Sequence, residues 1–459
     1  YMGKAINANA PYAAMSGNEY MDARFYEYGT YGPGYLINSD RRQITTDRAN
    51  TLLGLGSVPE ASSYKGTTVT KGDPKYIVKE YADNVYAQSE GDDKGLAKYG
   101  QEGYASAYGV TGGGLLKENN DNYYEVNSAD EFLDALSKVK ASGQPSVINL
   151  KADVNLGSKE VDTTKYSKII KPYAAQALTH PALVKSGVSI LSLESFNNLT
   201  IYSSNGSSIK HANITMKNST NIIVRNIKFD ELWEWDEYTS GDYDRNDWDY
   251  MTIDSGTNGV WIDHCTFYKA YDGVVDIKNP NPINNVTISW CEFLPGSEGD
   301  TFFNEMMDVM AANPSAYPYY KSLLDSGMTQ KQIWWYAYGQ KKTHLLGQSQ
   351  EATNAAGIRL TLANNYYKNS MDRMPRLRYG VAHVYNCIMD AQDLLTAKAS
   401  ITNKEAAKHI VSNGASSTCD GQLLVENSYI NGIINALNSG NGSDPSGYID
   451  AVNSLYYIN

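Results

Sequence analysis

Cysteine is scarce in this chain, with four residues among 459 and no Cys-x-x-Cys pair. That count excludes a disulfide-held scaffold at this length and gives no indication of a zinc site. No apolar run approaches the ~18 residues that a membrane-spanning helix needs, so we expect no membrane span. Basic residues are outnumbered, 39 against 51 acidic ones, and the formal charge is −12. Nucleic-acid binding needs a basic surface, so that class of function is excluded.

The chain starts at Tyr1 without a charged and then apolar leader segment. We therefore expect either a cytoplasmic protein or a secreted one whose signal peptide has already been removed. The 37 tyrosines and the many Asn, Ser and Gly residues are typical of extracellular, carbohydrate-active proteins and favour the second alternative.

An internal repeat is the clearest feature that the chain does contain. Six segments share an alternation of β-branched or apolar residues, then a polar residue, then a large apolar end. The shortest spacings are 26 residues (260 to 286) and 22 residues (360 to 382). Periods in this range indicate stacked supersecondary units, and the longer spacings leave room for inserted loops. The segments are IIVRNIKF (222–229), VWIDHCTF (260–267), VTISWCEF (286–293), LTLANNYY (360–367), AHVYNCIM (382–389) and LLVENSYI (423–430).

Two columns of this repeat indicate a bent strand. The fifth column is mostly Asn, which tolerates left-handed backbone and hydrogen-bonds its own backbone, so it marks a bend at one point of each coil. The last column is large and apolar, which predicts an interior stack. These features predict an all-β fold, a parallel β-helix with coils about 4.8 Å apart, because a propeller needs four strands per repeat. The fifth column is Asn226, His264, Trp290, Asn364, Asn386 and Asn427, and the last is Phe229, Phe267, Phe293, Tyr367, Met389 and Ile430.

Cys265 and Cys291 share a column in adjacent coils. The spacing would admit a disulfide. We favour two stacked, buried thiols, because free cysteine is among the most buried residue types.

The segments around the repeat divide the chain further. Ser128 and Glu131 form a capping box that opens a helix through about Lys140, and this helix would cap the open end of the solenoid. Residues 145–150 then read as the first strand. Residues 1–100 lack the repeat, and we expect them to be an extension packed on a solenoid domain of residues 101–459. Residues 295–340 interrupt the repeat with apolar residues at helical spacing, which predicts a helical insertion.

Four aspartates are candidates for a metal site. Asp272 and Asp276 are four apart, so in a strand they point to one face, and Asp247 and Asp249 share a face by the same rule. Asp249 and Asp276 are 27 residues apart, close to the 26-residue repeat, which places Asp249 beside the pair one coil away. Clustered carboxylates repel unless a cation lies between them, and calcium accepts such all-oxygen sites. The alternative is a solvated acidic face.

Basic residues gather in a second region. Arg373, Arg376 and Arg378 fall within six residues, a set that can bind carboxylates bidentately or form a plain basic surface. Lys342 lies one coil earlier. His344 follows it and is more often a packed or surface residue than a catalyst.

In order along the chain, six motifs resemble the signature of family 1 polysaccharide lyases, the pectate lyases. The resemblance runs from about residue 103 to about residue 430 and implies a right-handed parallel β-helix. The motifs are Trp261-Ile-Asp263-His264, Asp272-Gly-Val-Val-Asp276-Ile-Lys, Val286-Thr-Ile-Ser-Trp, Lys342 with Leu346-Gly347, Arg373-Met-Pro375-Arg376-Leu-Arg378 and His383-Val-Tyr-Asn.

The resemblance also implies roles. The chain would be a secreted lyase that cleaves polygalacturonate by calcium-dependent β-elimination, and we expect it to be a monomer. We interpret the first motif as structural packing. The insertion at 295–340 departs from the family pattern, and we expect it near the substrate cleft, because insertions in a solenoid emerge at its turns. The implied residues are Asp249, Asp272, Asp276 and Asp247 for calcium, Arg373 as the base that takes the C5 proton, and Lys342 and Arg378 for substrate carboxylates.

Three other functions compete with this one. A polygalacturonase needs an acid and a base carboxylate around the bond, and its Gly-His-Gly and Arg-Ile-Lys signatures are absent. A pectin lyase acts on methylated substrate without calcium, and the intact aspartates argue against it. A non-catalytic β-helix adhesin has no need for the arginine, lysine and aspartate set.

Overall fold

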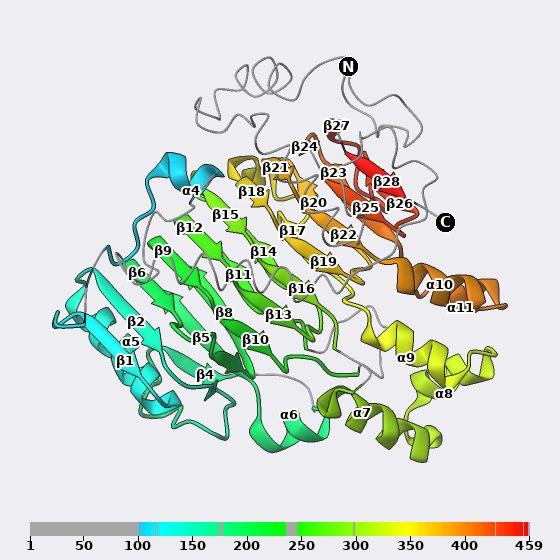
Figure 1. Cartoon of the computed structure of the whole chain (residues 1–459), viewed down its shortest axis with the longest axis horizontal. Helices are drawn as coiled ribbons and strands as arrows, with labels where there is room; N and C mark the ends of the chain where they lie inside the picture. The colour runs from blue at the N-terminus through cyan, green and yellow to red at the C-terminus, as the bar shows by residue number, and fades with distance from the viewer. Residues whose placement is uncertain are drawn as a thin grey trace, which may run out of the picture.

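The computed structural model describes residues 101–457, except 102, 115, 117, 174–177, 236–245, 297–298, 427 and 453. The extension expected over residues 1–100 and Asn427 lie outside the described residues. Successive repeats form coils, and each coil contributes one strand to each of three sheets, named here sheets A, B and C. Every pairing is parallel except β4 with β5. The right-handed parallel β-helix is confirmed, and Figure 1 shows its strands stacked in chain order from cyan to red.

The strands have the following bounds. Sheet A contains β1 (Tyr123–Val126), β2 (Ser146–Leu150), β6 (Asn197–Tyr202), β9 (Thr220–Arg225), β12 (Asn258–Asp263), β15 (Val286–Ser289), β18 (Arg359–Ala363), β21 (Val381–Tyr385), β24 (Gln422–Glu426) and β27 (Tyr448–Val452). Sheet B contains β3 (Val154–Asn155), β7 (Ser208–Lys210), β10 (Lys228–Asp230), β13 (Thr266–Tyr268), β16 (Glu292–Leu294), β19 (Tyr366–Lys368), β22 (Ile388–Asp390), β25 (Tyr429–Asn431) and β28 (Leu455–Tyr457). Sheet C contains β4 (Ile170–Pro172), β5 (Ser189–Glu194), β8 (Ala212–Lys217), β11 (Met251–Ile253), β14 (Val275–Ile277), β17 (Leu345–Leu346), β20 (Arg376–Arg378), β23 (Asn413–Thr418) and β26 (Asn435–Asn438).

The bend between sheets A and B lies at the fifth column of the repeat, as predicted. All five described members of that column adopt left-handed backbone, with φ between 51° and 60°. Asn is favoured there because its short side chain reduces the cost of this conformation. The five are Asn226, His264, Trp290, Asn364 and Asn386.

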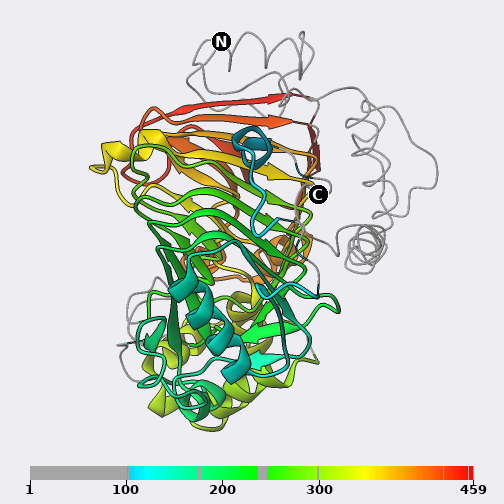
Figure 2. The same cartoon turned by 90° about the vertical axis from the view of Figure 1, so that its left-hand side faces the viewer.

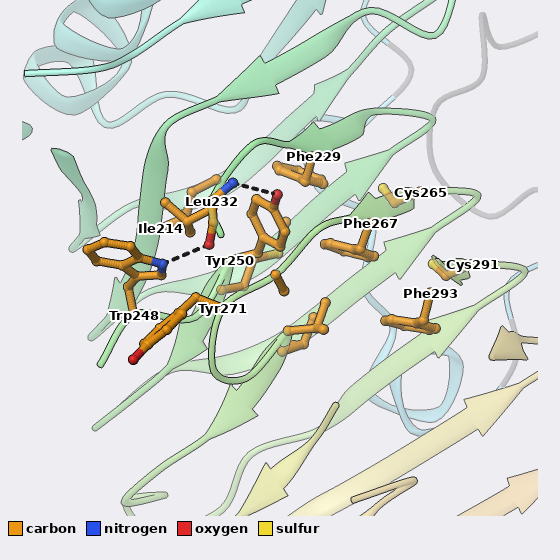
Figure 3. Close-up of a cluster of buried hydrophobic side chains, with 14 of the residues drawn as sticks. Ile214, Phe229, Leu232, Trp248, Tyr250, Cys265, Phe267, Tyr271, Cys291 and Phe293 are labelled. Carbon is orange, nitrogen blue, oxygen red and sulfur yellow. Dashed lines mark hydrogen bonds between the residues drawn. The ribbon is translucent and has the colours of Figure 1, made fainter. Parts of the chain in front are cut away.

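The last column forms the interior stack that the repeat predicted. The rings of Phe229, Phe267, Phe293 and Tyr367 lie parallel, with successive centroids 4.9, 5.2 and 4.7 Å apart. Figure 3 shows the three phenylalanines in a row beside the sulfur atoms of two neighbouring coils. All four cysteines are free and buried, so the prediction of stacked thiols is confirmed.

One end of the solenoid is closed by helix α5 (Ala129–Ser142), which Figure 2 shows at the end opposite the red strands. Ser128 caps the helix by accepting a hydrogen bond from the Glu131 amide, and Phe132 and Leu136 are buried in the main core. The cap is confirmed. The prediction that residues 145–150 form the first strand is wrong, because β1 precedes the helix and pairs with β2. Its four residues show none of the repeat pattern.

The remaining helices lie outside the sheets. The predicted insertion is confirmed as α7 (Thr301–Ala312), the 3₁₀ turn η3 (Pro314–Ala316), α8 (Pro318–Asp325) and α9 (Gln330–Tyr338), between β16 and β17. Helices α10 (Gln392–Ser400) and α11 (Lys404–Ala407) between β22 and β23, and α6 (Pro181–Ser186) between β3 and β5, were not predicted. The insertion and the α10–α11 pair leave the solenoid between a sheet B strand and the next sheet C strand, whereas α6 follows the sheet C strand β4. All of these helices lie along one edge in Figure 1. Elsewhere, α4 (Gly103–Tyr108) contacts sheet A, and η4 (Thr353–Gly357) precedes β18.

Candidate active site

The predicted site residues come together at one edge of sheet C. Strands β11, β14, β17 and β20 are neighbours in this sheet. Parallel strands start at the same edge, so residues just before these strands lie close together. Asp249, Asp272, Lys342 and Arg373 each precede one of the four strands by two or three residues. The site therefore spans four coils on the side from which the helical insertion emerges.

Asp249 and Asp276 form a buried pair on either side of Gly273. A Cβ atom at Gly273 would lie 2.3 Å from Asp249 Oδ1 and 2.7 Å from Asp276 Oδ1, so only glycine fits between them. Asp249 accepts hydrogen bonds from the Gly273 amide (3.1 Å) and the Thr252 hydroxyl (3.0 Å). Asp276 accepts one from the Leu345 amide at 2.8 Å.

Lys278 is the cation in contact with this pair. Its Nζ lies 3.3 Å from Asp249 Oδ2 and 4.0 Å from Asp276 Oδ2. Burial, and then repulsion by Asp249, raises the pKa of Asp276 to about 8. Burial likewise raises the pKa of Asp249. Two carboxylates this close favour a bound cation over mutual ionisation without one.

Asp272 belongs to a second group. It contacts the Nζ of Lys342 through Oδ1 at 2.5 Å. Burial alone would raise its pKa, but attraction to Lys342 and a hydrogen bond from Asp247 outweigh burial and lower it to about 2. The pKa of Asp247, which is exposed, rises to about 7, first through that hydrogen bond. Of these two carboxyls, Asp247 therefore holds a proton more readily than Asp272.

The carboxylate oxygens of this site suit a hard cation, but the four aspartates do not converge on one point. Within the described residues, no three His, Cys, Asp or Glu side chains lie close enough to hold a metal ion. The expectation that Asp272 and Asp276 share a strand face is wrong, because β14 begins only at Val275. Asp272 sits in the preceding bend and turns toward Lys342 instead. The oxygen ligands and the crowded negative charge still fit calcium, with Asp249 and Asp276 as the closest pair.

Arg373 differs from Arg376 and Arg378 because, among the described residues, its guanidinium makes no hydrogen bond or ion pair. The residue is half-buried with left-handed backbone, at φ 63°. Its Nε is buried without a hydrogen-bond partner, and it makes no ion pair within the described part of the chain. Its charge helps to lower the pKa of Asp272 and opposes the rise in the pKa of Asp276. A buried, unpaired donor beside carboxylates is a group available to a substrate.

Arg378 and Arg376 are both bound to Asp444. Arg378 donates from Nε to Asp444 at 2.7 Å and from Nη1 to the Gly347 carbonyl at 2.8 Å. Arg376 donates from Nη2 to the same carboxylate oxygen at 2.7 Å. Sequence reasoning missed Asp444, because it lies beyond the last recognised repeat and in no motif.

Lys342 lies at the site despite the insertion that precedes it. The segment after α9 is held by Gln340, whose side-chain amide donates to the Asp272 carbonyl (3.4 Å) and the Lys342 carbonyl (2.7 Å). The insertion thus ends in direct contact with the acidic group.

Comparisons with known proteins agree with this arrangement. The family model described as pectate lyase matches residues 93–298 and 335–441, more than half of the chain. This chain belongs to the pectate lyase family. The unmatched stretch between the two parts, residues 299–334, contains α7, α8 and the start of α9, so the family model does not include this part of the insertion.

Individual pectate lyases are also similar. Pectate lyase B of Paenibacillus amylolyticus is 44% identical over 351 residues, which cover 73% of this chain and 87% of the relative. A solved pectate lyase structure from Paenibacillus sp. 0602 has 40% identity and a TM-score of 0.72, covering 78% of this chain and 82% of that one. A pectate trisaccharide-lyase of Thermotoga maritima is 30% identical over 190 residues, 41% of this chain and 38% of the relative.

Two further motif residues of this pectate lyase are structural. Asp263 is fully buried, binds Arg225 Nε at 2.9 Å and accepts a hydrogen bond from Ser289 at 2.7 Å. His344 is also fully buried, with Nδ1 3.0 Å from the Val275 carbonyl and Nε2 3.2 Å from the Tyr367 hydroxyl. Both side chains hold neighbouring coils together.

Proposed function

We propose that this chain is a secreted pectate lyase that cleaves polygalacturonate by β-elimination, with Arg373 as the base. The observation that supports this most directly is the uncommitted guanidinium of Arg373 beside the Asp272 and Asp276 carboxylates. Asp249, Asp276, Asp272 and Asp247 would hold calcium. When bound, calcium supplies positive charge to substrate carboxylates and to the enolate that develops during the reaction.

The reaction requires one proton transfer and one bond cleavage. The C5 hydrogen of a uronate is acidified by its adjacent carboxylate, and Arg373 removes it after giving up a proton of its own. The electron pair forms the C4–C5 double bond as the C4–O bond breaks. No acid stands out for the leaving oxygen, so water supplies that proton.

Lys342 and Arg378 are proposed to bind substrate carboxylates. Lys342 Nζ is anchored by Asp272 at its own end of the site. Arg378 uses Nε and Nη1 within the protein, which leaves Nη2 without a hydrogen bond in the described part of the chain. A planar guanidinium fixed in this way presents a rigid donor to a carboxylate.

The test is Arg373→Ala, assayed by the ultraviolet absorbance of the 4,5-unsaturated product of polygalacturonate. Loss of a general base costs about 10²–10⁴-fold in turnover, and we expect at least that loss with an unchanged melting temperature. Arg359→Ala is the matched control, because the Arg359 guanidinium donates to the nearby Ala356 and Ile358 carbonyls. Near-native turnover of Arg373→Ala would overturn the proposed mechanism.

A second experiment, with a chelator, tests whether the activity depends on calcium. Excess EDTA should abolish activity of the wild-type chain, and added calcium should restore it. Full activity in the chelator would instead indicate a lyase of methylated pectin. We further infer an extracellular monomer, which size-exclusion chromatography of the full chain tests. None of the described helices is long and apolar enough to cross a bilayer.

A further inference from the structure

Lys278 occupies an unusual position at the floor of the acidic site. It follows β14, two residues after Asp276, and its side chain is 23% exposed, whereas the carboxylates of Asp249 and Asp276 are 2% exposed. Its ammonium lies between them, 3.3 Å from one and 4.0 Å from the other. Burying two carboxylates next to each other is costly without a compensating charge, so this ammonium offsets their repulsion.

Other cations of the site are placed differently. Lys342 is bound to Asp272, and Arg373 affects the pKa of Asp276 through its charge. Lys278 is the ammonium that pairs with both Asp249 and Asp276. The other hydrogen bonds to the two carboxylates come from neutral backbone amides and one hydroxyl.

We propose that Lys278 is an internal counter-ion that competes with calcium for the Asp249–Asp276 pair. In the metal-free chain the ammonium holds the two carboxylates together. When calcium binds, the same two carboxylates are required as ligands, and the ammonium must withdraw from them. A lysine side chain has four flexible bonds and a strongly hydrated head, so the exposed fraction of Lys278 offers a route toward solvent. This inference rests on the proposed calcium site.

The competition has two consequences that differ in sign. Removing the ammonium should weaken the metal-free fold, because two buried carboxylates then lack a counter-ion. It should also tighten calcium binding, because calcium no longer displaces a bound charge. Close charge pairs have coupling energies that correspond to about tenfold or more in affinity, so we expect calcium to bind Lys278→Gln about tenfold more tightly. A residue that merely orients the ligands would weaken calcium binding when replaced.

The experiment is isothermal titration of the full chain with calcium chloride, together with thermal unfolding in EDTA. Lys278→Gln keeps a hydrogen-bond donor for Asp249 without the charge, and Lys278→Met removes both. Lys217→Met is the matched control, because Lys217, the last residue of β8, pairs at 3.5 Å with Asp254, the residue after β11, and not with Asp249 or Asp276.

The expected result is tighter calcium binding and a lower melting temperature in EDTA for the Lys278 variants, but neither change for Lys217→Met. If wild type binds calcium and the Lys278 variants bind it equally or more weakly, the inference is overturned while the proposed function stands. If wild type itself does not bind calcium, the calcium assignment fails and the inference fails with it. Should Lys278→Met not fold, Lys278→Gln still decides the question.

Discussion

The buried His344 should make the fold sensitive to mild acid. Its Nδ1 faces the Val275 carbonyl and therefore carries the proton, while Nε2 accepts from the Tyr367 hydroxyl. A second proton would make Nε2 a donor, so the hydrogen bond with Tyr367 would have to reverse, and it would place a charge among Phe293, Tyr367 and the sheet backbone. Burial accordingly lowers the pKa of His344 from 6.5 to about 4.

The size and sign of the effect follow from this shift. In the unfolded chain the imidazole takes up a proton near pH 6.5, whereas in the folded chain it stays neutral down to about pH 4. Its contribution to stability is thus complete above pH 6.5 and is lost as the pH falls toward 4. The loss over this window is about 3 kcal/mol in the free energy of unfolding.

Urea unfolding of wild type and His344→Gln at a series of pH values measures the effect. Both chains share the carboxylates and His180, whose pKa burial also lowers to about 4. The difference between the two unfolding curves therefore isolates His344. We expect the stability gap between wild type and variant to narrow by about 3 kcal/mol from pH 7 to pH 4. A gap that stays constant across this range would refute the argument.

Two further predictions concern residues around the cleft. Asp444→Asn should weaken the hydrogen bonds that hold Arg376 and Arg378, lower the free energy of unfolding by about 1–3 kcal/mol and raise KM more than it lowers kcat, as steady-state kinetics would reveal. Equal losses in kcat and kcat/KM would count against a binding role for Arg378. Replacing residues 297–338 with a short Gly/Ser linker should shift the products on polygalacturonate toward longer fragments, if α7–α9 wall one end of the cleft. An unchanged product profile in a folded, active variant would show that these helices only pack on the outside.

The repeat columns predicted the core well because both depend on local rules. Left-handed backbone favours Asn, and the interior favours large apolar residues, each at a fixed position of the repeat. The Asn column and the Phe229–Phe293 stack could therefore be predicted from the sequence. Helices α10 and α11 could not be predicted from the sequence. Leu394 and Ala397 are the only buried residues of α10, and their spacing gives a weak pattern.

The site was harder to derive, because its details depend on register across coils. The repeat suggested that Asp249 lies beside Asp276. In the structure, β11 and β14 instead pair Thr252 with Asp276. The two carboxylates are close because both side chains point to the space beside Gly273. Lys278 was read only as the end of a motif. Its proximity to Asp249 on the preceding coil is a tertiary contact that no local pattern records.

The helical insertion leaves the solenoid after Phe293, yet the next coil keeps the same stacking position in the interior. Phe293 stacks on Tyr367 at 4.7 Å, a distance close to the 5.2 Å between Phe267 and Phe293, whose connecting coil is described throughout and contains no helix. The spacing of the interior rings therefore does not depend on how many residues are inserted at this turn. The segment between Phe293 and Tyr367 can therefore change in length without changing the spacing of the interior stack.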